Sequence, residues 1–528
     1  MSTLRCSQIQ IMKIIFALLT TWISFTKISA QILPGWQFNS LSGYNYYPTT
    51  NIIHDGTSTF VCSQSTDPLK VAYIYKLDDN GNLIAQDSIH NFDYSILDHK
   101  RMVRDNSGAI YLCGNEYDAF LNKTIRLIKF DSSLNRIWDV NFLDSNSQSS
   151  AATGLLYSST ENRISLVGEK YDSMDHTIIL KYDTSGNLLW ESIDTLTNTL
   201  SLTSYTIDNI GNVILGGYAF INGIGTAEDF VIYKTNTSGS LEWLVRENGS
   251  SNSDDMLFDL CVDFENNIYA SGIFEDTVRQ KIFKYNSAGN QIWTRNLPQI
   301  SFTKVAADLA GSLYIVGLDT VPEHEFAVLK YDSSGNFIHS ALSDLPDFNY
   351  YNQDYFVSIQ TNDSGNVFLL NNADSSGNYK WLAAKLDSTL NLKWAFVHPN
   401  STINPATTGA LCVVDDGIIV AGRIDNFLSV VHFEETFSSA IEKNTSDNNL
   451  FLWPNPTSSI LNISATNINT GYFQLKIYDV NSKVLLEKNL NTGNSNYFQQ
   501  DLSDFQSGLY FLTLLTKNSF YSGKFIIE

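Results

Sequence analysis

The sequence predicts an all-β protein built from tandem repeats, and three observations support this. A segment of the type Lys-Tyr-Asp-x-x-Gly-Asn-x-x-Trp recurs eight times at intervals of roughly fifty residues, a period typical of repeat architectures. A second segment, Asp-x-x-Gly-Asn followed by a β-branched run, precedes each copy. Aromatic residues make up 13% of the chain and charged residues only 17%, as expected for short strands joined by many turns. The copies of the first segment span 76–85, 129–138, 181–190, 234–243, 284–293, 330–339, 385–394 and, in degenerate form, 432–441.

Residues 1–30 predict a secretory signal peptide. Lys13 precedes an apolar run at 14–25, and small residues lead to Ala30, where we expect cleavage. Met12 is an alternative start, because a complete signal follows it. The apolar run is short for a membrane span, and no later segment approaches twenty apolar residues. We therefore expect an exported chain without a transmembrane segment after cleavage.

Each repeat between 31 and 437 divides into four strands. In the repeat at 202–246, one Asp/Asn-Gly turn joins the first strand to the second and another joins the third to the fourth. A single four-stranded sheet cannot bury both of its faces, whereas sheets arranged radially stack face to face. The repeats therefore predict an eight-bladed β-propeller. A seven-bladed ring is the alternative, because the first and last copies are degenerate.

The two ends of the repeat region predict how the ring closes. The last copy, after 428–434, has no Trp-containing fourth strand. Residues 35–39, Gly-Trp-Gln-Phe-Asn, have the pattern of such a strand with nothing before it. We therefore expect Trp36–Asn39 to complete the last blade. The repeats resemble the β-propeller repeats of bacterial secreted proteins over about residues 35–437, which implies a fold and not a function.

The C-terminal part predicts a separate module. Residues 438–449 form a polar linker without repeat features, and 450–528 alternate apolar and polar residues between turns, as in a small β-sandwich. Its distinctive residues are Pro454, Asn455, Pro456, Gly508, Tyr510 and Lys524, together with Ile477-Tyr478-Asp479, Lys483-Val484 and Leu502-Ser503. In these residues the module resembles the type A C-terminal sorting domain of the type IX secretion system of Bacteroidetes. Ser482 departs from the family pattern, which usually has Gly there.

This resemblance has consequences for partners and location. It implies contact with the type IX secretion machinery, passage across the outer membrane and removal of the module. It also implies release of the protein or its attachment to surface lipopolysaccharide. The protein is therefore expected to be secreted, either extracellular or on the outer-membrane surface.

Charge and cysteine usage limit the other partners. The formal net charge is −22, which repels phosphate backbones, so we expect no nucleic-acid partner. Cys62, Cys113, Cys261 and Cys412 lie in apolar runs without Cys-x-x-Cys spacing, which favours buried free thiols over disulfides or zinc. Asp-rich turns such as 78–80 leave calcium as an alternative, but the EF-hand pattern is absent and Asp or Asn side chains capping their own turns explain these residues. No cofactor and no metal site are predicted.

No catalytic motif is found. The eight histidines are scattered, and there is no His-Glu-x-x-His, Gly-x-Ser-x-Gly or phosphate-binding loop, so no catalytic residue is predicted. Loops that differ between repeats are the usual place for recognition on a rigid scaffold. Tyr350, Tyr351 and Trp381 are the predicted ligand-stacking residues; the alternative is that they pack onto their own loops.

The sequence predicts a binding or adhesion scaffold on the cell surface or released from it. A lyase or hydrolase that acts on polysaccharides through the variable loop face is the alternative. A third hypothesis is that the protein is a structural component of the envelope without a small ligand.

Overall fold

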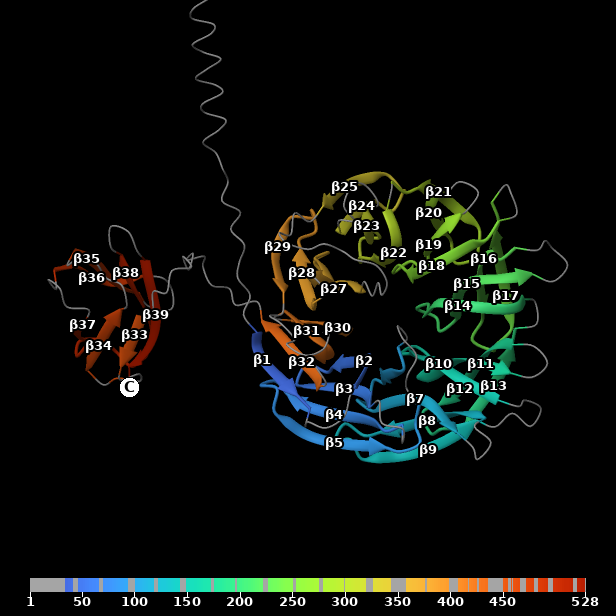
Figure 1. The fold of residues 1–528 in the computed structure, drawn as a ribbon, viewed down its shortest axis with the longest axis horizontal. Helices are drawn as coiled ribbons and strands as arrows, with labels where there is room; N and C mark the ends of the chain where they lie inside the picture. The colour runs from blue at the N-terminus through green and yellow to red at the C-terminus, as the bar shows by residue number, and fades with distance from the viewer. Residues whose placement is uncertain are drawn as a thin grey trace, which may run out of the picture. The chain divides into compact units, whose positions relative to one another are not determined.

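The computed structural model contains only β-strands as regular elements among its described residues, which confirms the predicted all-β class (Figure 1). The described residues are 34–527 except 41–45, 66–69, 94–99, 118–121, 143–148, 172–174, 195–196, 222–226, 250–252, 275–278, 299, 320–325, 343–357, 376–377, 398–406, 416, 425–426, 435–449, 454–456, 458, 466–471, 479–482, 492–496 and 516–519. The predicted signal peptide and linker lie outside them. Strands β1 to β32 belong to one compact unit and β33 to β39 to another.

The first unit consists of eight four-stranded antiparallel sheets within the described residues. We number them as sheets 1 to 8. Sheets 1 to 4 are β2 (Tyr46–His54), β3 (Ser58–Ser65), β4 (Ala72–Asp78) and β5 (Leu83–Ile89); β6 (Met102–Arg104), β7 (Ile110–Tyr117), β8 (Lys123–Phe130) and β9 (Arg136–Phe142); β10 (Ser149–Ser158), β11 (Arg163–Tyr171), β12 (Asp175–Asp183) and β13 (Leu188–Ile193); and β14 (Thr197–Ile207), β15 (Val213–Ile221), β16 (Asp229–Thr235) and β17 (Leu241–Glu247).

Sheets 5 to 8 continue in the same order. They are β18 (Asp255–Val262), β19 (Ile268–Phe274), β20 (Arg279–Tyr285) and β21 (Gln291–Asn296); β22 (Ile300–Ala307), β23 (Leu313–Asp319), β24 (Phe326–Tyr331) and β25 (Phe337–Leu342); β26 (Ser358–Thr361), β27 (Val367–Ser375), β28 (Asn378–Leu386) and β29 (Leu392–Val397); and β30 (Thr407–Val414), β31 (Gly417–Ile424), β32 (Phe427–Glu434) and β1 (Pro34–Asn39).

The sheets form a ring because apolar side chains fill the space between consecutive neighbours. Eight buried clusters each combine residues of two successive sheets, and one of them joins sheet 8 to sheet 1. The clusters replace the single core of an ordinary domain, as stacking of radial sheets requires. Figure 1 shows the sheets following one another around the ring. The predicted β-propeller is therefore confirmed.

The N-terminal strand completes sheet 8, as predicted. β1 pairs antiparallel with β32, and Trp36 lies opposite His432 while Phe38 lies opposite Val430. The Trp36 and His432 rings are 5.6 Å apart between centroids. A strand from one end of the repeat region thus holds the strand from the other end, which closes the ring non-covalently.

The Asp-x-x-Gly-Asn turns share one hydrogen-bond pattern. In the turn of sheet 1, Asp78 Oδ1 accepts from the backbone N–H groups of Asn80 and Asn82, and Asn82 Nδ2 donates to Asp78 Oδ2. Side chains that bond to their own backbone in this way stabilise turns. The carboxylates predicted to cap their own turns therefore do so, and the pattern recurs from Asp131 to Asn135, Asp183 to Asn187, Asp208 to Asn212, Asp332 to Asn336 and Asp387 to Asn391.

These turns predict that the protein loses stability in acid. Hydrogen bonds from Asn82 and Asn336 lower the pKa of Asp78 and Asp332 below the ordinary value of 3.8. A carboxylate whose folded pKa is depressed stabilises the fold above its unfolded pKa, and this contribution disappears as pH falls through the folded pKa. We therefore expect the melting temperature, followed by circular dichroism, to decline as pH is lowered below 3.8.

A matched variant separates the turns from other acid effects. Asn236 and Asn286 occupy the equivalent position in sheets 4 and 5 and accept the same backbone hydrogen bonds through Oδ1. Asp332→Asn should therefore keep the turn at neutral pH and flatten the acid decline, increasingly so when combined with Asp78→Asn. A decline as steep as that of the unchanged protein would show that other groups cause it.

Neighbouring sheets are also joined through these turns. The turn between the third and fourth strands of a sheet accepts, at one backbone carbonyl, hydrogen bonds from a Lys and a Trp of the preceding sheet. Lys234 Nζ and Trp243 Nε1 both donate to Ser287 O, at 3.0 and 3.1 Å. Lys284 Nζ and Trp293 Nε1 donate to Ser333 O in the same way, at 3.1 and 3.2 Å. The repeated Lys and Trp of the sequence therefore connect one sheet to the next.

Two sheets lack the Trp, and the next turn changes with them. Ala85 and His339 stand where other sheets carry Trp in the fourth strand. In the turn that follows each of them in the ring, Leu134 and Leu390 replace Gly and keep a positive φ of 64° and 62°. Both leucines are buried between the two sheets. In these two places a Leu of the turn therefore fills the space between the sheets. Elsewhere a Trp of the fourth strand fills it.

The second unit contains a three-stranded and a four-stranded sheet. Tyr510, Leu512 and Phe525 of the larger sheet pack against Leu461 and Ile463 of the smaller one in a single buried cluster. This arrangement agrees with the predicted β-sandwich. The sheets are β33 (Leu450–Trp453), β34 (Ile460–Ala465) and β37 (Tyr497–Asp501), called sheet 9; and β36 (Val484–Asn491), β35 (Tyr472–Tyr478), β38 (Gly508–Leu515) and β39 (Phe520–Ile527), called sheet 10.

Candidate functional site

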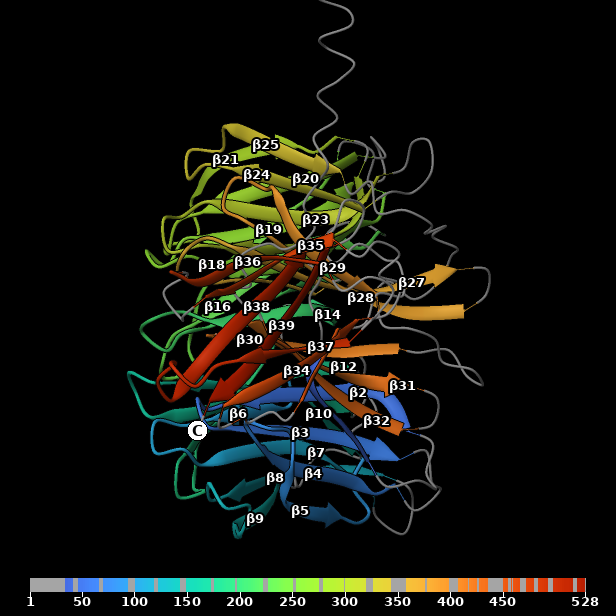
Figure 2. The same ribbon diagram turned by 90° about the vertical axis from the view of Figure 1, so that its left-hand side faces the viewer.

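The two faces of the ring differ in chemistry. Because the strands are antiparallel, the turns from first to second and from third to fourth strand lie on one face, which we call the turn face. Connections from second to third strand and between sheets lie on the other, the loop face. Figure 2 shows the ring from its side, with the β27–β28 hairpin extending past the neighbouring strands on the loop face.

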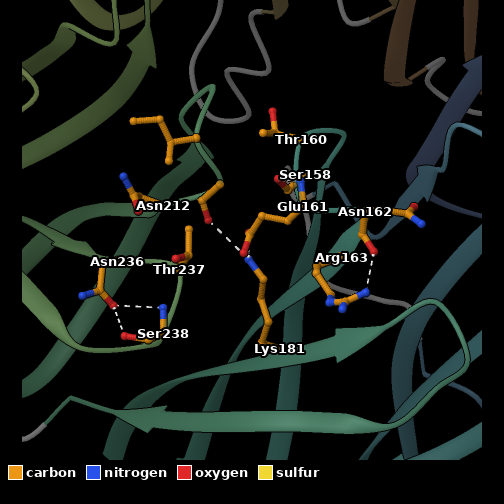
Figure 3. Close-up of polar contacts among 12 residues, drawn as sticks. Ser158, Thr160, Glu161, Asn162, Arg163, Lys181, Asn212, Asn236, Thr237 and Ser238 are labelled. Carbon is orange, nitrogen blue, oxygen red and sulfur yellow. Dashed lines mark hydrogen bonds and ion pairs between the residues drawn. The ribbon is translucent and has the colours of Figure 1, made fainter.

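The charges of the turn face are used for contacts within the ring. A buried Lys of the third strand pairs with a carboxylate of its own sheet's first turn, as Lys234 does with Asp208 at 3.0 Å and Lys284 with Asp263 at 3.6 Å. The first turn of sheet 3 does not have the Asp-x-x-Gly-Asn sequence, and Glu161 supplies the carboxylate there, 2.5 Å from Lys181 Nζ (Figure 3). The substitution preserves the ion pair, which indicates a structural role for this lysine in each of these three sheets.

A different cluster lies on the loop face between sheets 1 and 2. Lys70, in the connection from β3 to β4, places Nζ 3.6 Å from the ring centroid of Tyr117 and 3.5 Å from Asp93 Oδ2. The Tyr117 hydroxyl donates to the same carboxylate oxygen. Asp93 is fixed by two backbone hydrogen bonds with Asn115, at 2.7 and 3.0 Å. We call Lys70, Asp93 and Tyr117 the loop-face cluster.

Backbone strain accompanies this cluster. Lys70 and Asn91 adopt positive φ angles of 46° and 51°, which are uncommon for residues other than glycine. Phe92 N, next to Asn91, donates to Lys70 O at 2.9 Å, and Asn91 Nδ2 donates to Tyr117 O at 3.0 Å. Strain of this kind concentrates at functional sites because the surrounding structure must maintain it.

Electrostatics fix the protonation states of the cluster. Burial raises the pKa of Tyr117, and its hydrogen bond to Asp93 raises it further. Burial on its own lowers the pKa of Lys70, but Tyr117 and Asp93 outweigh it, so the pKa lies above the ordinary value. At neutral pH the Lys70 ammonium and the Tyr117 phenol therefore both keep their protons, and the phenol donates its hydrogen bond to Asp93.

The residues predicted to stack on a ligand are not part of this cluster. Tyr350 and Tyr351 lie outside the described residues. Trp381 is only 1% exposed and belongs to the core between sheets 7 and 8, together with Trp394 and Phe433. Its position in β28 points it between the sheets, so Trp381 packs in this core and not onto its own loop, and the prediction that it stacks on a ligand is corrected.

Metal and thiol chemistry find no support in the described part of the chain. No group of three His, Cys, Asp or Glu side chains there is arranged to hold a metal ion. Cys62 and Cys113 are buried free thiols, as predicted, and burial raises the pKa of Cys113 to about 12. A thiol with so high a pKa remains protonated and is a poor nucleophile. Within the described residues no helix has the length and apolarity needed to cross a membrane.

The predicted sorting-motif residues divide into a buried and an exposed group. Tyr510 is buried, donates from its hydroxyl to Gln506 O at 2.6 Å and stacks on Phe525. Gly508 begins the same strand, and Lys524 is exposed on the neighbouring β39. Pro454, Asn455 and Pro456 lie outside the described residues. Tyr510 therefore supports the sandwich, and Lys524 belongs to its surface.

Comparison with solved structures gives distant similarities. A mutant puromycin hydrolase complexed with PGG has a TM-score of 0.45 at 10% identity, covering 72% of this chain and 58% of that one. The BP39L lectin from Burkholderia pseudomallei has a TM-score of 0.44 at 9% identity, covering 67% and 99%. A PL25 ulvan lyase has a TM-score of 0.40 at 11% identity, covering 77% and 96%. At these values no activity transfers to this chain. No curated protein sequence matches it.

The family comparison identifies the second unit. Residues 451–528 match the secretion system C-terminal sorting domain. The match covers the sandwich of sheets 9 and 10 and includes the motif residues recognised in the sequence. Since this domain directs type IX export, the chain is an exported β-propeller protein with a type IX C-terminal sorting domain.

Proposed function

We propose that the propeller is a binding or adhesion scaffold, displayed on the cell surface or released, whose ligand contacts the loop face. The observation that carries this proposal is the loop-face cluster. Its three side chains do not recur as a set, because Lys70 and Tyr117 have equivalents only in Lys123 of sheet 2 and Tyr171 of sheet 3. Lys70 is about 40% exposed beside the half-buried Tyr117. On the turn face, by contrast, the repeated lysines Lys234 and Lys284 are buried and pair with a carboxylate of their own sheet. Non-repeated polar groups on a rigid ring are typical of recognition sites.

The protonation states favour binding over catalysis at this cluster. A lyase or hydrolase requires a group that removes a proton near neutral pH. Burial and Asp93 raise the pKa of Tyr117, so its hydroxyl donates a hydrogen bond in place of accepting a proton. The Lys70 ammonium group beside the Tyr117 ring suits the hydroxyl and carbonyl groups of a glycan or a peptide. Tyr350 and Tyr351 remain proposed stacking residues for such a ligand.

Glycan and protein arrays probed with the full chain test this proposal. We expect binding to at least one class of ligand, and Lys70→Ala and Tyr117→Phe should each weaken it about tenfold, as loss of one charged or neutral hydrogen bond predicts. Tyr111→Phe is the matched control, because its hydroxyl donates to Asp105 on the turn face at 2.8 Å. Tyr350→Ala and Tyr351→Ala test the stacking residues.

Turnover assays on polysaccharides run beside the arrays. Product formation that a single Asp, Glu or His substitution on the loop face abolishes would overturn the binding proposal in favour of an enzyme. If Tyr111→Phe and Tyr117→Phe weaken binding equally, the substitutions act by lowering the stability of the fold and not by removing a contact with the ligand.

A further inference from the structure

The two outward surfaces of the sorting domain differ in chemistry. On sheet 10, Phe511 lies directly opposite Lys524, and Leu509 lies opposite Ile526. Directly paired residues of neighbouring strands lie on the same face. All four side chains are exposed, the three apolar ones by 38–44%. We call Leu509, Phe511, Lys524 and Ile526 the outer face of sheet 10.

The alternation of β38 makes this exposure unavoidable. Tyr510, Leu512 and Leu514 are buried in the core of the sandwich, so Leu509 and Phe511 must point the other way. A phenylalanine at an exposed position adds nothing to the core that its neighbours already form. Contiguous exposed apolar residues on a small domain usually mark an interaction site.

Sheet 9 provides the internal comparison. Its outward positions on β34 and β37 hold Asn462 opposite Gln499, which hydrogen-bond at 2.8 Å, and Ile460 opposite Asp501. Ile460 is the one large apolar side chain among these four residues, and it is 47% exposed. Three polar side chains with a single isoleucine are typical of an ordinary solvated surface. The apolar outer face of sheet 10 is therefore a feature of that sheet and not of the sandwich as a whole.

Basic residues border the outer face of sheet 10. Lys524 lies beside Phe511, and Lys476 of the adjacent β35 is paired with Glu487 at 3.3 Å. Lys483, just before β36, is also exposed. In a chain with a net charge of −22, a face that combines apolar side chains with lysines is unusual. It fits a partner surface that is apolar in its centre and carries carboxylates at its rim.

We propose that the outer face of sheet 10 is the surface by which a component of the type IX secretion machinery holds the sorting domain. The proposal rests on the sorting function of residues 451–528, because a domain read by a secretion system must present a surface to it. The core residues cannot be that surface. Phe511 and Ile526 would enter an apolar groove of the component, and Lys524 would pair with a carboxylate beside it.

Export of the full chain in a host with a functional type IX system tests the proposal. The variant Phe511→Ser with Ile526→Ser should lower the protein on the surface and in the medium at least tenfold and leave it in the periplasm. Ile460→Ser, an equally exposed isoleucine on sheet 9, should be exported normally. Lys524→Glu should impair export, and Lys524→Arg should restore it. Purified variants must keep the melting temperature and protease resistance of the unchanged protein.

Two further arms separate the outcomes. Deleting residues 451–528 should abolish export; export without them would overturn the sorting function itself. If the deletion blocks export but the folded Phe511→Ser, Ile526→Ser variant is exported normally, the sorting function stands and the docking face is wrong. A photo-crosslinking phenylalanine analogue at position 511, but not at 460, should link to a named component of the machinery. A crosslink only to a second copy of the chain would make the face a dimer contact and contradict the proposal.

Discussion

Deleting residues 34–40 should lower the melting temperature of the propeller by about 10 °C or more, because it removes the strand that closes the ring. β1 is the fourth strand of sheet 8, and without it β32 keeps only β31 as an antiparallel partner. Trp36 also covers the turn of sheet 1, so closely that a Cβ placed on Gly81 would overlap the Trp36 ring. Sheet 8 would thus lose both its outer strand and part of its contact with sheet 1.

The deletion needs two comparisons, followed by differential scanning calorimetry. Trp36→Ala keeps the strand and removes the ring, so it should cost about 3 kcal/mol and shift the transition less than the deletion does. Removing residues 31–33 alone leaves β1 complete and should change the transition little. A deletion of 34–40 that melts like the unchanged protein would mean that sheets 1 and 8 hold the ring closed without β1.

The repeated part of the fold was predictable because its causes are local and occur many times. Asp78 and Asn82 determine one turn from five consecutive residues, and seven further copies make the period visible. The position of the Trp36 strand was predictable for the opposite reason. It was a single strand without a sheet of its own, and the last repeat was a sheet without a fourth strand. The outward face of sheet 10 follows from alternation once Tyr510 is known to be buried.

The loop-face cluster could not be predicted from the sequence. Lys70 and Asp93 come from two connections and Tyr117 from the end of β7, and the fold brings them together only because sheets 1 and 2 are neighbours. Lys70 and Tyr117 each have one equivalent in another repeat, Lys123 and Tyr171, but the sequence gives no sign that they meet Asp93. The ligand-stacking prediction for Trp381 failed for a related reason. The sequence around Trp381 resembles a variable loop, but Trp381 is a paired residue of β28 whose side chain faces sheet 8.

The pairing of Trp with Gly between neighbouring sheets predicts strong non-additivity at Trp293 and Gly335. Trp293 is buried, and a Cβ on Gly335 would lie 2.7 Å from its ring, at a φ of +78°. Trp293→Ala should destabilise the propeller by about 3–5 kcal/mol because it empties the space between sheets 5 and 6. Gly335→Leu alone should cost several kcal/mol by forcing its side chain into the indole, on the order of an overpacked core.

The double variant should be more stable than the sum of the single effects allows, by about 2 kcal/mol or more. It recreates the arrangement that the protein already uses where Ala85 faces the turn of Leu134, which is buried at a φ of 64°. The free energies come from urea unfolding of the full chain, with Trp293→Ala and Gly239→Leu combined as the control, because Gly239 contacts Trp190 and not Trp293. Additive effects in the matched pair would mean that Leu134 and Leu390 do not substitute for Trp, and that sheets 2 and 7 are held by other contacts.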